Sequence, residues 1–255
     1  MGAYYNEIDP YAAQWLRNLI LAGHIAAGDV DERSIEDVRP DDLRGYTQCH
    51  FFAGIGAWSF ALRMAGWDDR RPVWTGSCPC QPFSVAAVAW DRKGFDDHRH
   101  LWPVWFNLIR ECQPLQIFGE QVGSKDGLAW LDTVFDDFGS EDYACGAAHI
   151  GASDFGADHI RKRLYFFSHS VREGWAGHQP IECIPVATRE AFAESRNAAS
   201  RIRSAMAGDY VDLLPGDEPS IAVERLRAHG YGNAINAQAA TAFIEAAMET
   251  MEETV

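Results

Sequence analysis

The chain has 255 residues, six cysteines and a net charge of −15, a length sufficient for one sizeable core. It has no apolar stretch near the ~20 residues that a membrane-spanning helix needs, and its first residues lack the basic and apolar blocks of a secretory signal. The cysteines form no CxxC pair and show no zinc spacing, so we expect reduced thiols in a cytoplasmic protein, no bound metal and no membrane partner.

The negative charge is unevenly distributed along the sequence. Residues 158–229 hold ten basic and ten acidic side chains, so the rest of the chain carries the whole −15. Most of the basic residues in this balanced segment are arginines, which are well suited to bind phosphate groups. Two interpretations stay open, a phosphate-binding face and an ordinary solvated surface.

The first predicted elements are a strand, a helix and a second short element. An extended start over residues 2–8 precedes Asp9-Pro10, a pair typical of a helix N-cap and first turn. Apolar residues at helical spacing predict a helix over residues 11–22. Gly28-Asp29-Val30 then begins another short element, and residues 39–42 read as a polar connector.

A strand, a glycine turn and a helix follow within residues 47–65. The strand covers residues 47–52, the turn contains Gly54 and Gly56, and the helix covers residues 57–65. Glycines let the backbone approach a ligand, and the amino end of a helix favours polar or anionic groups. This succession is the start of a nucleotide-binding α/β unit, although Gly-x-Gly alone is a weak signal.

A stiff loop with the sequence GSCPCQPFS occupies residues 76–84, directly after the apolar run 72–75. Pro79 and Pro82 restrict the backbone on both sides of Cys80. A thiol at the carboxyl end of a strand lies where open α/β sheets bind ligands, which makes Cys80 a candidate nucleophile. The alternative is a buried, unreactive cysteine in a proline-rich turn, the usual state of a free cysteine.

The second half of the chain alternates helices and strands before the pattern decays. It predicts a helix over residues 100–112, a strand over 114–118 that ends at Gly119-Glu120, a helix over 128–138, and paired strands over 143–150 and 164–168. Periodicity is weak from residue 169 to about 224, which predicts a small irregular region. A terminal helix over 234–248 and a frayed tail over 249–255 complete the chain.

Five segments, taken in order, resemble the motifs of DNA cytosine-5 methyltransferases, particularly the compact versions found in phages and prophages. They are the cofactor loop Phe52-Ala53-Gly54-Ile55-Gly56, the nucleophile motif Pro79-Cys80-Gln81-Pro82-Phe83-Ser84, Glu120-Gln121-Val122, Arg161-Lys162-Arg163 and Gly232-Asn233-Ala234-Ile235. The resemblance implies an α/β fold, a Rossmann-like class I methyltransferase mixed sheet with helices on both faces. Residues 1–168 and 225–248 would form the catalytic domain, and 169–224 a small target-recognition region.

The resemblance also implies a permuted strand order at the N-terminus. The family has two further cofactor motifs between the glycine loop and the nucleophile loop, and the chain leaves no room for them between Gly56 and Gly76. Asn6-Glu7 and Gly28-Asp29-Val30 resemble these two motifs. We therefore expect the family's second and third strands to come first and its first strand to follow. Ordinary turn residues are the alternative explanation for both segments.

Each site residue takes a role from this resemblance. Cys80 would add to carbon 6 of a cytosine that has left the duplex, Glu120 would hold the base, and Arg161 and Arg163 would contact its carbonyl oxygen and nearby phosphate. The implied cofactor, S-adenosylmethionine, would contact Glu7, Ile8, Asp29, Val30, Phe52, Ala53, Gly54, Ile55, Gly56, Pro79, Asn233 and Ala234. The implied partner of an expected monomer is double-stranded DNA, contacted by Gln81, Ser84, Arg99, Arg201 and Arg203.

Several residues depart from the family's pattern. Gln121 replaces an asparagine, Cys78 replaces the first proline of Pro-Pro-Cys, His50 stands where an acidic residue is usual, Ala57-Trp58 replaces a glycine and a variable residue, and Asp158-His159 replaces Pro-Gln. These changes leave two alternatives open beside methylation of cytosine carbon 5. One is the same thiolate chemistry with another one-carbon donor or with deamination, and the other is a DNA-binding pseudoenzyme.

Overall fold

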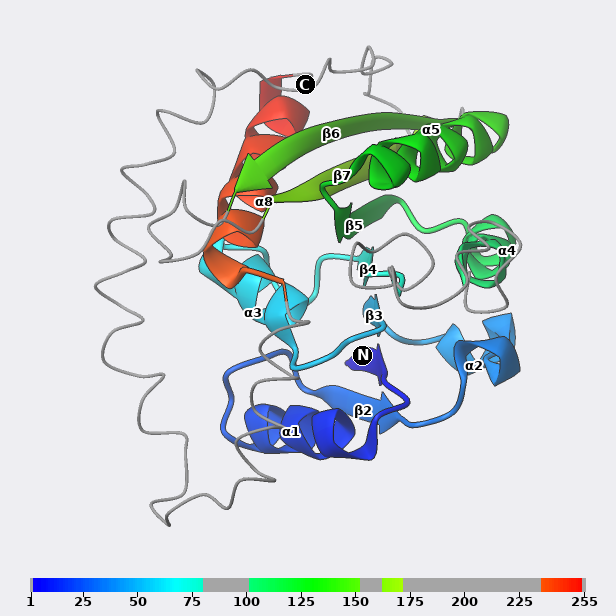
Figure 1. Cartoon of the computed structure of the whole chain (residues 1–255). Coiled ribbons are helices and arrows are strands. Elements are labelled where there is room, and N and C mark those ends of the chain that lie inside the picture. Colours follow the sequence, from blue (N-terminus) through cyan, green and yellow to red (C-terminus); the bar gives the residue numbers. More distant parts are fainter. Residues whose placement is uncertain (1, 80–100, 152–161, 172–234, 254–255) are drawn as a thin grey trace, which may run out of the picture.

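A computed structural model describes residues 2–79, 101–151, 162–171 and 235–253, which form a seven-stranded sheet with helices on both faces (Figure 1). The strands are β1 (Ala3–Asn6), β2 (Gly28–Asp31), β3 (Gln48–Phe51), β4 (Val73–Gly76), β5 (Gln116–Val122), β6 (Tyr143–Gly151) and β7 (Lys162–Ser170). The helices are α1 (Pro10–Leu21), α2 (Pro40–Leu43), α3 (Ala57–Met64), α4 (Trp102–Cys112), α5 (Lys125–Ser140) and α8 (Ala237–Glu253), with a 3-10 turn at Ile35–Asp37. The predicted α/β class is confirmed.

The strand order across the sheet is β2-β1-β3-β4-β5-β7-β6. Neighbours from β2 to β5 are parallel, whereas β7 is antiparallel to both β5 and β6. The chain therefore enters at β1, moves outward to β2 and returns to β3, which lies between β1 and β4. These are the neighbours that the expected permutation requires. That this order rearranges the family's own stays a prediction.

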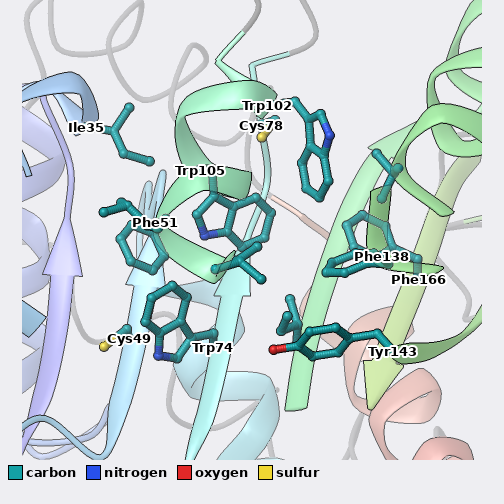
Figure 2. Packing of buried hydrophobic residues seen from close by; sticks show 14 of the residues in the cluster. Ile35, Cys49, Phe51, Trp74, Cys78, Trp102, Trp105, Phe138, Tyr143 and Phe166 are labelled. Atoms are coloured by element: carbon teal, nitrogen blue, oxygen red, sulfur yellow. The ribbon is translucent and has the colours of Figure 1, made fainter. Parts of the chain in front are cut away.

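Alternating side chains divide the core between the two faces of the sheet. On one face, Phe51 and Trp74 pack with aromatic residues of α4 and α5 (Figure 2). Tyr4 belongs to the same cluster. On the other, Tyr5 packs with α1, and Phe118 packs with α3 and α8. Strands β1, β3 and β4 are thus buried on both faces, which is typical of a parallel α/β sheet. None of the described helices is long and apolar enough to cross a membrane.

Among the elements that differ from their predicted extents, three have an identifiable physical cause. Strand β5 continues past Glu120 to Val122, because β7 pairs with it as far as Val122 opposite Arg163. Helix α8 runs to Glu253 rather than ending at 248, because Met251 is buried in the core beside α3, so residues 249–253 are helical rather than frayed. The predicted polar connector at 39–42 contains the short helix α2, which Leu43 anchors in the core.

Candidate active site

The predicted site residues that the structure describes lie mostly at one edge of the sheet. Strands β1, β3 and β4 end side by side, with Asn6 opposite Phe51 and Phe51 opposite Gly76. Glu7 follows β1, the glycine loop follows β3, and Glu120 is near the end of β5. Ligands of open α/β sheets bind at the carboxyl ends of the strands, so this edge is the candidate active site.

Two hydrogen bonds tie the glycine loop to the end of β1. The backbone N–H of Ala53 donates to the Asn6 carbonyl oxygen over 3.0 Å. The N–H of Gly54 donates to Oε2 of Glu7 over 2.7 Å, and the N–H of Asp9 donates to Oε1 over 2.9 Å. The structure therefore brings together Glu7 and the loop, as the resemblance implied.

The Glu7 carboxyl group is mostly removed from water. Burial raises its pKa, and the backbone N–H groups of Asp9 and Gly54 oppose this by favouring the charged form. Each carboxylate oxygen has a second lone pair, so both can accept a further hydrogen bond. Glu7 can therefore bind a hydroxyl group of a ligand while it holds the loop.

The glycine loop has an unusual backbone that leaves space in front of it. Gly54 has φ +54° and Gly56 has φ +81°, and among the described residues no atom lies within 4 Å of a Cβ built at Gly54. Phe52 also has a positive φ, +51°, which costs a residue with a side chain roughly 1–3 kcal/mol. An edge-on contact with Trp105, with ring centroids 6.3 Å apart, supports Phe52 in this conformation. Strained backbone of this kind clusters at ligand sites.

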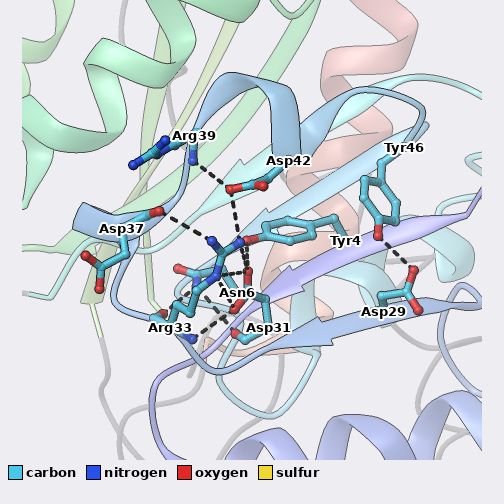
Figure 3. A network of polar contacts seen from close by, with 9 residues as sticks. All are labelled: Tyr4, Asn6, Asp29, Asp31, Arg33, Asp37, Arg39, Asp42 and Tyr46. Atoms are coloured by element: carbon cyan, nitrogen blue, oxygen red, sulfur yellow. Dashed lines mark hydrogen bonds and ion pairs between the residues drawn. The ribbon is translucent and has the colours of Figure 1, made fainter.

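Asp29 is not brought to this edge. It pairs in register with Tyr4, two residues before the end of β2, and its carboxylate accepts a hydrogen bond from Tyr46 over 2.8 Å (Figure 3). Its neighbour Val30 packs against the core beside α1, and Ile8 is 65% exposed next to Glu7. A contact from Asp29 to the cofactor stays a prediction, and the described geometry does not favour it.

Asp31 occupies the edge position of β2, opposite Asn6, and the sequence reasoning missed it. Its carboxylate accepts hydrogen bonds from Tyr4 over 2.7 Å and from the Arg33 guanidinium over 2.7–3.1 Å (Figure 3). Burial raises the pKa of Asp31, but these hydrogen bonds outweigh it and the net pKa is lowered. The Asp-x-Arg spacing after a short strand was the available signal for this ion pair.

Glu120 and Arg163 meet on one face of β5 and β7. Glu120 is opposite Tyr165 in the antiparallel register, and Arg163 lies two residues before Tyr165 in β7, on the same face. Arg163 Nε is 2.5 Å from Glu120 Oε1, and the two side chains are 21% and 9% exposed. Two residues with predicted catalytic roles therefore form a largely buried ion pair.

Ser77 and Cys78, which connect β4 to Pro79 and Cys80, are fixed by contacts with the rest of the protein. Ser77 Oγ accepts a hydrogen bond from the indole N–H of Trp58 over 3.0 Å. Cys78 is buried in the core, and burial raises the pKa of its thiol far above the ordinary range, so Cys78 is not an activated nucleophile. Pro79 is half-buried and is the last described residue of this segment.

The remaining predicted site residues lie outside the described ranges and stay predictions. They are Cys80, Arg161, Asn233 and Ala234, together with the DNA contacts Gln81, Ser84, Arg99, Arg201 and Arg203. The same holds for nearly all of the expected recognition region 169–224. Within the described ranges, no group of three or more His, Cys, Asp or Glu side chains is arranged to hold a metal ion.

Comparison with known proteins places the chain in a family. A family model for C-5 cytosine-specific DNA methylase matches residues 69–204, just over half of the chain. The chain belongs to this family of enzymes. The matched segment includes the Cys80 loop, Glu120 and Arg163, and it begins after the glycine loop. A search of curated protein sequences finds no match.

The chain is similar to solved structures of methyltransferases. The Dnmt2 methyltransferase of S. pombe is 12% identical with a TM-score of 0.51, covering 98% of this chain and 99% of that one. A Spodoptera frugiperda DNMT2 mutant (14% identical, TM-score 0.46) covers 73% of this chain and 47% of its own. A candidate DNA modification methyltransferase encoded within an E. coli prophage (20%, TM-score 0.44) covers 74% and 47%. The chain thus spans about half the length of these last two proteins. The likeness to the S. pombe protein supports the Rossmann-like methyltransferase fold.

Proposed function

We propose that the protein is a DNA cytosine C5-methyltransferase, which transfers a methyl group from S-adenosylmethionine to carbon 5 of a cytosine flipped out of DNA. The observation that carries the proposal is the Glu120–Arg163 pair at the same sheet edge as the Glu7–Gly54 contact. It occurs in a chain whose family acts on cytosine in DNA. In this proposal, the Glu120 and Arg163 side chains bind the cytosine base, and the Glu7 carboxylate and the Gly54 backbone lie where the methyl donor binds.

The residues at this edge fit S-adenosylmethionine. Glu7 offers carboxylate oxygens to the ribose hydroxyl groups, and the uncovered backbone at Gly54 allows close approach. Phe52 offers an aromatic surface beside them, and α3 points its amino end at the loop. When bound, the cofactor supplies an electrophilic methyl group. Asp31 is already engaged by Tyr4 and Arg33, so Glu7 is the carboxylate at this edge that we assign to the cofactor.

Cys80 performs the covalent step in this proposal. Carbon 5 of cytosine is a weak nucleophile, so a thiolate must first add to carbon 6 and form a C–S bond. The electron pair released into the ring makes carbon 5 an enamine carbon that can accept the methyl group. Loss of the carbon 5 proton then restores the double bond as the C–S bond breaks. A thiolate suits the step because it is both a strong nucleophile and a good leaving group.

Glu120 and Arg163 hold the base during this step. The Glu120 carboxyl group would bind N3 and the exocyclic amine, where the ring needs a proton as the thiolate adds. Arg163 fixes the orientation of that carboxyl group through its Nε and keeps a partly exposed guanidinium for the carbonyl oxygen or a phosphate. The target base must leave the duplex to reach them.

Mass spectrometry of nucleosides from DNA of cells that express the protein tests the proposal. We expect 5-methylcytosine with the wild type and none with Cys80→Ser. Cys112→Ser is a matched control, because Cys112 is a half-buried thiol at the far end of α4, and it should methylate like the wild type. A different modified base or uracil would support another outcome of the same thiolate chemistry, and unmodified DNA that is still bound would support a pseudoenzyme.

A further inference from the structure

Trp58 connects α3 to the segment that leads to Cys80. It lies in the first turn of α3, directly after the glycine loop, and is 4% exposed. Its indole N–H donates to Ser77 Oγ over 3.0 Å. Ser77 follows β4 and precedes Cys80 by three residues. The helix of the cofactor loop therefore holds the start of the nucleophile loop.

The Trp58 ring is fixed by the two strands that carry the Glu120–Arg163 pair. Its centroid is 6.1 Å from Phe118 on β5 and 6.1 Å from Tyr165 on β7, edge-on to the latter. Tyr165 is the register partner of Glu120. The indole N–H is consequently directed by side chains that flank the predicted base-binding pair.

Ser77 and Cys78 are held from opposite faces of the sheet. Ser77 is bonded to Trp58 of α3, whereas Cys78 is buried with Trp102 and Trp105 of α4 on the other face (Figure 2). Pro79 follows with a fixed φ. The family pattern has a proline where this chain has Cys78, and that proline would restrict the backbone. Here the contacts of the Ser77 and Cys78 side chains restrict this segment instead.

We propose that Trp58 is a positioning residue for the nucleophile loop, and that its hydrogen bond to Ser77 sets the direction in which the chain presents Cys80. The inference rests on the proposed function, because it assigns Trp58 a role in the covalent step. In addition, it makes the Trp58 side chain the link between three parts of the site: the helix after the cofactor loop, the strands β5 and β7, and the start of the nucleophile loop. In this proposal Trp58 acts through Ser77.

The rate of covalent adduct formation on duplex DNA that contains 5-fluorocytosine measures this role. We expect Trp58→Phe and Ser77→Ala each to slow single-turnover adduct formation about tenfold, because small misplacements of reacting groups are costly. The double variant should be no slower than either single one. Ser77→Thr keeps the hydroxyl group and should react near the wild-type rate. The affinity for S-adenosylhomocysteine, measured by calorimetry, should stay unchanged in all four variants.

Trp67→Phe provides the matched control. Trp67 is buried on the same face, packs edge-on against Phe118, and donates its indole N–H to the Arg71 carbonyl oxygen over 3.1 Å. This variant loses an equivalent hydrogen bond and should react like the wild type. A wild-type rate in Trp58→Phe, an equal loss in Trp67→Phe, or multiplied effects in the double variant would overturn the inference alone. No adduct in the wild type would overturn the proposed function and the inference with it.

Discussion

The Glu120 carboxylate and the Arg163 guanidinium lie 2.5 Å apart on neighbouring antiparallel strands, with most of both side chains shielded from water. Each group compensates the burial of the other. Removing one partner of such a pair leaves an uncompensated charge, which is more costly than losing a surface ion pair. The pairing therefore places two opposite charges, largely shielded from water, at the carboxyl edge of the sheet.

Substitution of this pair should abolish most methyl transfer. We expect Glu120→Gln to lower the transfer of tritiated methyl groups to DNA by about 100-fold or more, because the amide cannot share a proton with N3 as charge develops on the ring. Arg163→Lys keeps the charge but loses the fixed fork geometry, and it should be impaired as well. Asp132→Asn, on the exposed side of α5, is the control. Undiminished transfer by Glu120→Gln would remove Glu120 from the active site.

Loss of the Glu7 carboxylate should weaken cofactor binding. Hydrogen bonds to a charged group are strong, so Glu7→Gln should raise the Kd for S-adenosylhomocysteine about tenfold or more, as measured by calorimetry. Burial raises the pKa of Glu7, so wild-type affinity should fall as the pH is lowered into the acid range, whereas the affinity of Glu7→Gln should not follow it. The exposed Glu111 on α4 provides the control Glu111→Gln. Equal affinities for wild type and Glu7→Gln would refute both the site and the permutation that led to it.

Gly76 leaves space for the side chain of Trp105, so the effects of substituting these two residues on stability should depend on each other. A Cβ at position 76 would lie 2.5 Å from Cη2 of the fully buried Trp105, so Gly76→Ala should lower the free energy of unfolding by about 1–3 kcal/mol. Trp105→Leu makes room, so the double variant should lose less stability than the sum of the two single variants. Gly139→Ala on α5 meets no atom within 4 Å and should be neutral or slightly stabilising in urea titrations. Additive losses would show that the two side chains do not compete for space.

His50 should make the protein sensitive to acid. It is fully buried, its Nδ1 is 2.8 Å from Thr75 Oγ1, and burial lowers its pKa from 6.5 to about 3. The unfolded chain binds the proton first as the pH falls, so the stability present above pH 6.5 is lost progressively towards pH 3. At pH 5 the loss is about 2 kcal/mol. Urea titrations at pH 7 and pH 5 measure how far the free energy of unfolding falls between these two pH values. This fall should be about 2 kcal/mol smaller in His50→Gln than in the wild type. Parallel pH dependences would show that His50 is not buried in its neutral form.

Sequence patterns were most informative where a local feature fixes the structure. Asp9 caps α1 with hydrogen bonds from Tyr11 and Ala12, as the Asp-Pro pair predicted. The motif resemblance predicted that Glu7 and the glycine loop contact the same cofactor, and the described structure places the two side by side. Their contacts to a cofactor stay predictions. Glu120 and Arg163 were predicted to share one base, and they lie together. Their roles in catalysis stay predictions.

Features that depend on distant partners were not predictable in this way. The extra length of β5 comes from its pairing with β7, which no local pattern in residues 114–122 indicates. Asp29 was chosen because of its motif, but the register with β1 puts Asp31 at the strand's end instead. The Trp58–Ser77 hydrogen bond joins α3 to the segment that follows β4, 19 residues later in the chain. It could not be predicted from local patterns, because it depends on how the helix packs on the assembled sheet.

Because β3 lies between β1 and β4, the N-terminal strands also cover one edge of β3. Without β1 and β2, one whole side of β3 would present unpaired N–H and C=O groups along a strand that is buried in the native sheet. A bare strand of that kind is a template for pairing with other chains and for aggregation. A truncation that removes the N-terminal strands would thus cost the protein its solubility as well as Glu7, and an expression fragment should begin before Ala3.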